Sequence, residues 1–161
     1  MKEGIHVMHL FYRLDRMMWA ELEPGESSKA RDNLESLCEA NNNTSHPLIR
    51  PYANVGGKAD LAFMLFHEDL SGLAQLHRDL EACFPPGALE IVYSYLSVTE
   101  LTDYMPTDTD LEARAKWEFK LRPGTDAFNK KMEELHQWNK DYKHHRLYPE
   151  MPDWDVMCFY P

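Results

Sequence analysis

The chain has 161 residues, of which 43% are hydrophobic, so it is long enough and apolar enough for one domain with a real core. Its formal net charge of −10 argues against nucleic acid and against anionic membranes as partners. It has no run of about 18 apolar residues, and Met1–Gly4 lead directly into a strand pattern, so we expect a cytoplasmic protein without a transmembrane helix or a signal peptide.

A strand and a helix are expected in the N-terminal part of the chain. His6–Tyr12 is rich in apolar and aromatic residues, which favours a strand. Pro24-Gly25 is expected to break the chain, and Ser27 or Ser28 to cap a helix that ends at Asn41–Asn43. The apolar positions of this helix fall on one face: Ala30, Leu34, Leu37 and Cys38.

A hairpin, a second helix and a fourth strand follow. Leu48–Val55 and Ala59–His67 are strand patterns, and Gly56-Gly57 between them is typical of a hairpin turn. Asp69 can cap a helix before the last strand pattern, Leu89–Leu101. The apolar positions of that helix again share a face: Leu73, Leu76, Leu80 and Cys83.

The element order βαββαβ predicts an α+β fold of the ferredoxin-like, split βαβ type. We assign residues 1–104 to this domain. Residues 105–124 have weak periodicity and are read as a linker, with a short helix from Asp110. Residues 125–161 are expected to form the incomplete beginning of a second ferredoxin-like unit.

That second unit should open with a helix and continue into a strand. Thr125 or Asp126 can cap the helix, and Trp154–Tyr160 is the strand pattern. The apolar residues that share a helix face are Phe128, Met132, Leu135 and Tyr142.

The third strand pattern bears on what covers the sheet. Leu61–Phe66 does not alternate between apolar and polar residues, so both faces of the sheet should be covered, by a second sheet or by a second copy of the chain. Under this hypothesis the adjacent residues Phe63 and Met64, which point to opposite faces, are both buried.

Several local patterns predict no chemistry. Gly56-Gly57-Lys58 lacks the upstream glycine and the following Ser or Thr of a phosphate-binding loop. Two pairs of histidines do not converge on a point and are read as core or surface residues: His6 with His9, and His144 with His145. The cysteines have no zinc-binding spacing and are expected to be buried free thiols: Cys38, Cys83 and Cys158.

The segment from residue 146 to residue 161 is the most informative for function. Arg146-Leu147-Tyr148-Pro149 leads through a Pro-Asp-Trp turn to Cys158-Phe159-Tyr160-Pro161. These motifs resemble those of the chlorite-dismutase-like haem proteins, and among them the coproheme decarboxylases of bacterial haem synthesis. Less specific similarity extends over much of the chain: Phe11–Asp15, Gly57–Leu61 and Tyr93–Leu101.

The resemblance implies hydrogen-peroxide-dependent oxidative decarboxylation of coproheme to haem b, with the iron porphyrin as cofactor. Tyr160 would be the catalytic residue, because the matching tyrosine is oxidised to a radical that takes hydrogen from a propionate, which then loses carbon dioxide. Arg146 would anchor a propionate, because a planar guanidinium can hold a carboxylate through two hydrogen bonds.

In the resembled family the Phe-Tyr-Pro motif continues into Met-Ser-Lys-Arg, and the histidine that ligates iron follows later. We therefore expect the iron ligand beyond residue 161 and no metal ligand within this chain. The missing C-terminal half would be supplied as a separate fragment or chain. The resemblance also implies a homo-oligomer, specifically a pentamer.

Without the resemblance, Tyr160 reads as a packed strand residue and Arg146 as a surface arginine. Two alternatives stay open. One is a non-catalytic oligomeric scaffold or regulatory paralogue, and the other is a chlorite dismutase or haem peroxidase.

Overall fold

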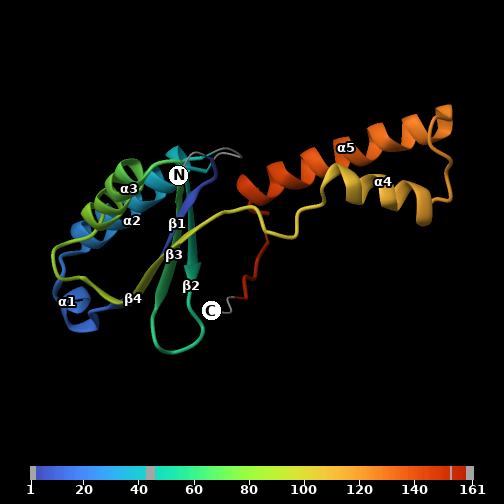
Figure 1. Cartoon of the computed structure of the whole chain (residues 1–161). Coiled ribbons are helices and arrows are strands. Elements are labelled where there is room, and N and C mark those ends of the chain that lie inside the picture. Colours follow the sequence, from blue (N-terminus) through green and yellow to red (C-terminus); the bar gives the residue numbers. More distant parts are fainter. Residues whose placement is uncertain (1–2, 43–45, 153, 159–161) are drawn as a thin grey trace. The chain divides into compact units, whose positions relative to one another are not determined.

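The structure is a computed structural model, and it describes residues 3–42, 46–152 and 154–158 (Figure 1). The chain divides into two compact units, one formed by residues 1–99 with 150–161 and the other by residues 100–149. Among the described residues, no helix combines the length and the apolar character needed to cross a lipid bilayer.

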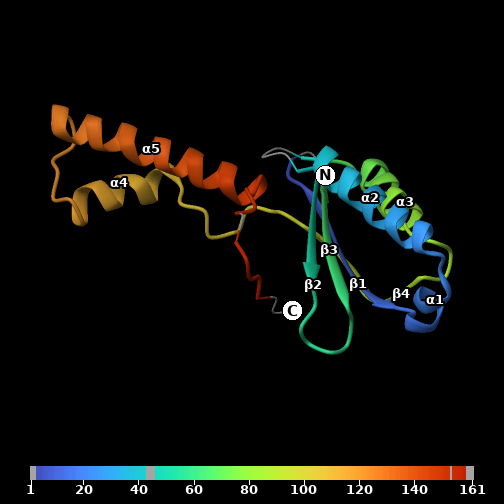
Figure 2. The ribbon, with the colours of Figure 1, turned by 180° about the vertical axis from the view of Figure 1, so that it is seen from behind.

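The first unit is a four-stranded antiparallel sheet with helices on one face. In chain order its elements are β1 (His6–Leu14), α1 (Arg16–Glu21), α2 (Pro24–Ala40), β2 (Leu48–Ala53), β3 (Leu61–His67), α3 (Leu70–Ala82) and β4 (Leu89–Val98). The strand order is β2-β3-β1-β4, and α2 and α3 lie side by side in both views (Figures 1 and 2). This is the predicted ferredoxin-like arrangement, which the structure confirms.

The core of this unit lies between the sheet and its two long helices. Leu10 and Tyr12 of β1 and Phe63 and Leu65 of β3 are at most 1% exposed. They pack against α3 through its predicted apolar face: Leu73, Leu76 and Leu80. Each buried side chain of this size contributes about 1.5–3 kcal/mol, so the helix is held chiefly by this face.

The start of α3 shows close packing between a glycine and a ring. Asp69 caps the helix as predicted, with its Oδ1 accepting a hydrogen bond of 2.7 Å from the backbone N–H of Gly72. The ring of His67 lies against Gly72 so closely that a Cβ atom at position 72 would overlap it. His67 Nδ1 also accepts a hydrogen bond from the backbone N–H of Asp69.

Two predictions for the N-terminal part are wrong. The helix α2 begins at Pro24, not after Ser27 or Ser28, and Glu23 and Glu26 close a reciprocal capping box there. Proline suits the first turn of a helix because its missing N–H has no partner in that turn, so Pro24-Gly25 opens the helix and does not break the chain. A further short helix, α1, follows β1 because Asp15 caps it.

The prediction that both sheet faces are fully covered is only partly met. Phe63, on the helix side, is 1% exposed, but Met64 is half-buried. On the same face as Met64, Phe66 is 2% exposed whereas Tyr93 of β4 is 54% exposed. Within the described residues of this unit, no second sheet covers this face.

The second unit is a helical hairpin of α4 (Asp108–Trp117) and α5 (Asp126–Leu147). The helix α4 begins at Asp108, two residues before the predicted start at Asp110; Thr107 caps it, and Asp110 completes the capping box. Thr125 caps α5, as predicted. The core between α4 and α5 is small and consists of four buried side chains: Leu111, Ala115, Phe128 and Leu135.

The strand predicted from Trp154 is absent from the described part of that segment. Residues 154–158 adopt no regular structure, and Tyr160 lies outside the described residues. Trp154 and Val156 are largely exposed, and no strand of the described sheet pairs with this segment. Cys158 is exposed, which corrects the expectation that all the thiols are buried.

Candidate functional site

Arg146 lies in the last turn of α5. The helix ends there because Tyr148 leaves the helical conformation before Pro149. The last turn carries His144, His145 and Arg146, and positive charge is favourable at that end because it complements the helix dipole. The Arg146 side chain is exposed, and the ion pairs formed among the described residues do not include it. Its guanidinium is therefore available to an external carboxylate.

The other predicted site residue, Tyr160, lies outside the described residues. The structure thus positions one of the two candidates, and their roles remain predictions. Among the described residues, no group of three or more His, Cys, Asp or Glu side chains is arranged to hold a metal ion.

The histidines that the sequence set aside lie in separate places. His6 and His9 are buried in β1, at 8% and 6% exposure. His6 Nδ1 interacts with the Glu68 carbonyl, and His9 stacks on Tyr95 at 4.1 Å between ring centroids. Burial lowers the pKa of His9 from its ordinary value, which keeps the ring neutral. His144 and His145 are exposed on α5.

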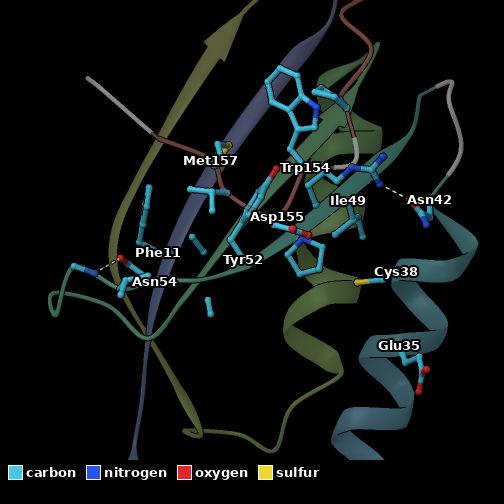
Figure 3. A pocket seen from close by; sticks show the side chains of 18 of the residues that line it. Phe11, Glu35, Cys38, Asn42, Ile49, Tyr52, Asn54, Trp154, Asp155 and Met157 are labelled. Atoms are coloured by element: carbon cyan, nitrogen blue, oxygen red, sulfur yellow. Dashed lines mark hydrogen bonds between the residues drawn. The ribbon is translucent and has the colours of Figure 1, made fainter.

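One cavity of the first unit was not expected from the sequence. It has a volume of about 940 Å³ and lies along β2 (Figure 3). Its walls come from three segments that are distant in sequence: α2 with Glu35 and Cys38, β2 with Ile49 and Tyr52, and the terminal segment with Trp154. The sequence does not predict this cavity, because the approach of Pro152 and residues 154–157 to β2 is a tertiary contact.

The walls of this cavity combine aromatic and apolar side chains with one guanidinium, that of Arg50, and three carboxylates, those of Glu35, Glu39 and Asp155. Burial raises the pKa of Tyr52, and the nearby Arg50 partly opposes this rise. Arg50 also donates a hydrogen bond to Asn42 Oδ1. With three carboxylates against one guanidinium the cavity does not favour an anionic group, and Tyr52 would act there as a neutral hydrogen-bonding phenol. Arg146 is not among its lining residues.

Comparison with known proteins places the chain in a family. The sequence model of the chlorite dismutases matches residues 27–161, which covers most of α2 and continues to the terminal motif. This chain belongs to the chlorite dismutase family. The match includes Arg146 and Tyr160, the two residues singled out by the sequence motifs.

Solved structures of similar fold agree with this assignment. A protein from Thermus thermophilus, described as a novel heme-binding protein, superposes with a TM-score of 0.59 at 26% identity, over 93% of this chain and 51% of its own. Two variants of the chlorite dismutase from Candidatus Nitrospira defluvii share the fold. One has a TM-score of 0.53 and 14% identity, over 97% of this chain and 74% of its own. The other has a TM-score of 0.51 and 17% identity, over 78% of this chain and 51% of its own. This member of the chlorite dismutase family thus spans about half the length of the heme-binding relative.

Proposed function

We propose that this chain takes part in the hydrogen-peroxide-dependent oxidative decarboxylation of coproheme to haem b. Tyr160 would be the redox-active residue and Arg146 the anchor for a propionate. The observation that carries the proposal is the pairing of Arg146-Leu147-Tyr148-Pro149 with Cys158-Phe159-Tyr160-Pro161 inside the family match. The similarity to a heme-binding protein from Thermus thermophilus supports an iron porphyrin as the bound group.

The described part of the site fits the carboxylate of such a group. Arg146 is exposed at the end of α5, with the neighbouring His144 and His145 adding to the basic character of that turn. In a chain of net charge −10, such a local concentration of basic side chains is what a carboxylate would need. A guanidinium can bind both oxygens of one propionate at once, which fixes orientation as well as position.

Tyr160 would remove hydrogen from the propionate side chain. Its phenol Oη gives up a proton and an electron, and the oxidised residue then takes a hydrogen atom from the side chain. For each propionate, the reaction converts one carboxylate, one peroxide and one proton into a vinyl group, carbon dioxide and two waters. The haem iron, when bound, supplies the oxidising equivalents that peroxide brings.

We further propose that the site is completed by residues outside 1–161. The chain spans 51% of the heme-binding relative, and the iron-ligating histidine is expected in the half that is not covered. A second chain or a further segment would then contribute the histidine that holds the iron, within a homo-oligomer for which the family resemblance implies five subunits.

The test is to supply coproheme and hydrogen peroxide to the native assembly, with any chain that co-purifies, and to follow the porphyrins by chromatography. We expect a monovinyl intermediate and then haem b. The Tyr160→Phe variant should bind coproheme but form neither product, whereas the matched control Tyr104→Phe, at a position that is 94% exposed, should keep wild-type activity. Full activity of Tyr160→Phe would exclude the mechanism.

A chlorite dismutase or peroxidase is the second candidate, favoured by the description of the matching family. Chlorite should then be converted to chloride and dioxygen by the haem-loaded assembly, and the propionates of coproheme should survive peroxide. If the Soret band of coproheme does not shift when coproheme is titrated into the native assembly, the non-catalytic scaffold becomes the preferred interpretation.

A further inference from the structure

The core of the sheet unit contains a phenol whose hydroxyl meets two side chains of α3. Tyr12 of β1 is 1% exposed and belongs to the core cluster between the sheet and the helices. Its Oη lies 3.0 Å from His77 Nε2 and 3.5 Å from Glu81 Oε1. His77 and Glu81 are four residues apart on α3, so both project from the same face of the helix, and their Nε2 and Oε1 atoms are 3.4 Å apart.

The exposure of these three side chains increases from the phenol to the carboxylate. The Tyr12 side chain is buried, that of His77 is 24% exposed, and that of Glu81 is 48% exposed. A phenol has a single proton to donate, and the imidazole and the carboxylate are both able to accept it. The three groups therefore form a path along which a proton of Tyr12 can reach solvent.

The surroundings of Tyr12 oppose its ordinary ionisation. Burial, followed by the charge of Glu81 and the hydrogen bond to it, raises the pKa of the phenol, so Tyr12 stays protonated. Loss of an electron reverses this preference, because an oxidised phenol is a strong acid. An electron can leave a buried ring across several ångströms, whereas the proton needs a base within hydrogen-bonding distance. A buried tyrosine is therefore readily oxidised only where such a base is present.

His77 meets the requirements for that base. Its Nε2 lies within the 2.6–3.2 Å range, approximately, over which a positioned base takes a proton, and it can accept one when Nδ1 carries the ring hydrogen. At 3.5 Å, Glu81 Oε1 is the weaker acceptor for the hydroxyl. The same oxygen is 3.4 Å from Nε2, so it would pair with the imidazolium that forms.

We propose that Tyr12 is a redox-active tyrosine with His77 as its proton acceptor. A one-electron oxidant, of the kind that peroxide chemistry generates, takes one electron from the phenol. The O–H bond breaks as His77 Nε2 takes the proton, which leaves a neutral tyrosyl radical beside an imidazolium. A one-electron reductant such as ascorbate returns the electron, and the proton goes back to Oη. Because Tyr12 is 1% exposed, its radical cannot couple with the phenol of another molecule. This activity is separate from the role proposed for Tyr160 and does not depend on it.

Electron paramagnetic resonance provides the first test. The native protein is mixed with hexachloroiridate(IV), a one-electron oxidant, and frozen rapidly. We expect a tyrosyl signal that ascorbate removes, and Tyr12→Phe should lose most of it. The matched control Tyr104→Phe removes a hydroxyl at a position that is 94% exposed and should keep the signal. Absence of a tyrosyl signal in the wild type, or an undiminished signal in Tyr12→Phe, would refute the proposal.

A second variant separates proton transfer from a structural hydrogen bond. His77→Gln leaves the Tyr12 hydroxyl a hydrogen-bonding partner, but an amide does not take up a proton at neutral pH. The rate of radical formation in stopped-flow experiments should fall about hundredfold, as the loss of a positioned base does, while the denaturation midpoint stays close to that of the wild type. The control His136→Gln replaces an exposed histidine that also faces a carboxylate, Asp108, and should leave the rate unchanged.

An unchanged rate in His77→Gln would show that His77 is not the acceptor. A rate that falls only in proportion to the loss of folded protein would likewise contradict the proposal, because the contact between Tyr12 and His77 would then be structural.

Discussion

Among single residues, the contrast between two arginines of the hairpin bears most directly on function. Arg114 is held by Glu118 at 2.8 Å, and hydrogen bonding to that carboxylate raises the pKa of the guanidinium. Arg146 forms none of the ion pairs found among the described residues. A paired arginine stabilises a helix, whereas an exposed one without a carboxylate partner is free to bind a ligand.

Replacing Arg146 should therefore affect substrate binding more than turnover. For Arg146→Ala we expect the KM for coproheme to rise about tenfold to hundredfold, because a hydrogen bond to a charged group contributes about 1.5–3 kcal/mol, while kcat changes little. The matched control is Arg122→Ala, an exposed arginine in the α4–α5 loop, which should leave KM as it is. Steady-state kinetics of the native assembly measures both. An unchanged KM for Arg146→Ala would refute its role as the anchor.

The buried histidines predict how stability depends on pH. Burial lowers the pKa of His9 and is also the largest cause of the lowered pKa of His46. Between the folded and the unfolded pKa the unfolded chain binds more protons, so the free energy of unfolding should fall as the pH drops below about 6.5. Denaturant titrations between neutral pH and pH 5 measure this slope.

The His9→Gln variant should have a smaller slope than the wild type, whatever its absolute stability, because one of the buried groups no longer titrates. The control His145→Gln replaces an exposed ring and should retain the wild-type slope. An identical slope in wild type and His9→Gln would show that burial does not hold the His9 ring neutral.

At the scale of helices and strands, the sequence predicted those elements whose signals are local. Asp69 and Thr125 cap the predicted helices, and the apolar face of α3 is the one that packs on the sheet. The start of α2 differs from the prediction because proline, which breaks a helix in its interior, is tolerated in the first turn, where Pro24 lies. The large cavity was missed because it depends on the terminal segment meeting β2, which no local pattern specifies.

The cap of α3 allows a direct test at this scale. Asp69→Ala removes the acceptor for the Gly72 N–H and should lower the free energy of unfolding by about 1 kcal/mol. Asp69→Asn should restore most of the loss, because an amide oxygen can cap equally well. Glu68→Ala, at the exposed neighbouring position, is the control. If Asp69→Asn is as unstable as Asp69→Ala, the charge and not the hydrogen bond provides the stabilisation.

For the whole molecule, the division into two units predicts that they lose structure separately. Leu111 is 1% exposed and belongs to the small core of the hairpin, so Leu111→Ala should cost about 2–5 kcal/mol and unfold α4 and α5. Hydrogen exchange should show loss of protection in residues 108–147 with the sheet unaffected. Leu73→Ala, in the core of the sheet unit, should give the opposite pattern. Joint loss of protection in either variant would contradict independent units.

The contact between His67 and Gly72 limits which sequences this fold can accept. A side chain at position 72 would displace the imidazole that accepts the backbone N–H of Asp69, so the first turn of α3 would be disturbed together with the end of β3. The two positions are therefore expected to covary. In family members with alanine or a larger residue at position 72, position 67 should be occupied by something other than a ring. In this chain, Gly72→Ala alone should force the His67 ring to move and lower stability, and shortening His67 as well should restore part of the loss.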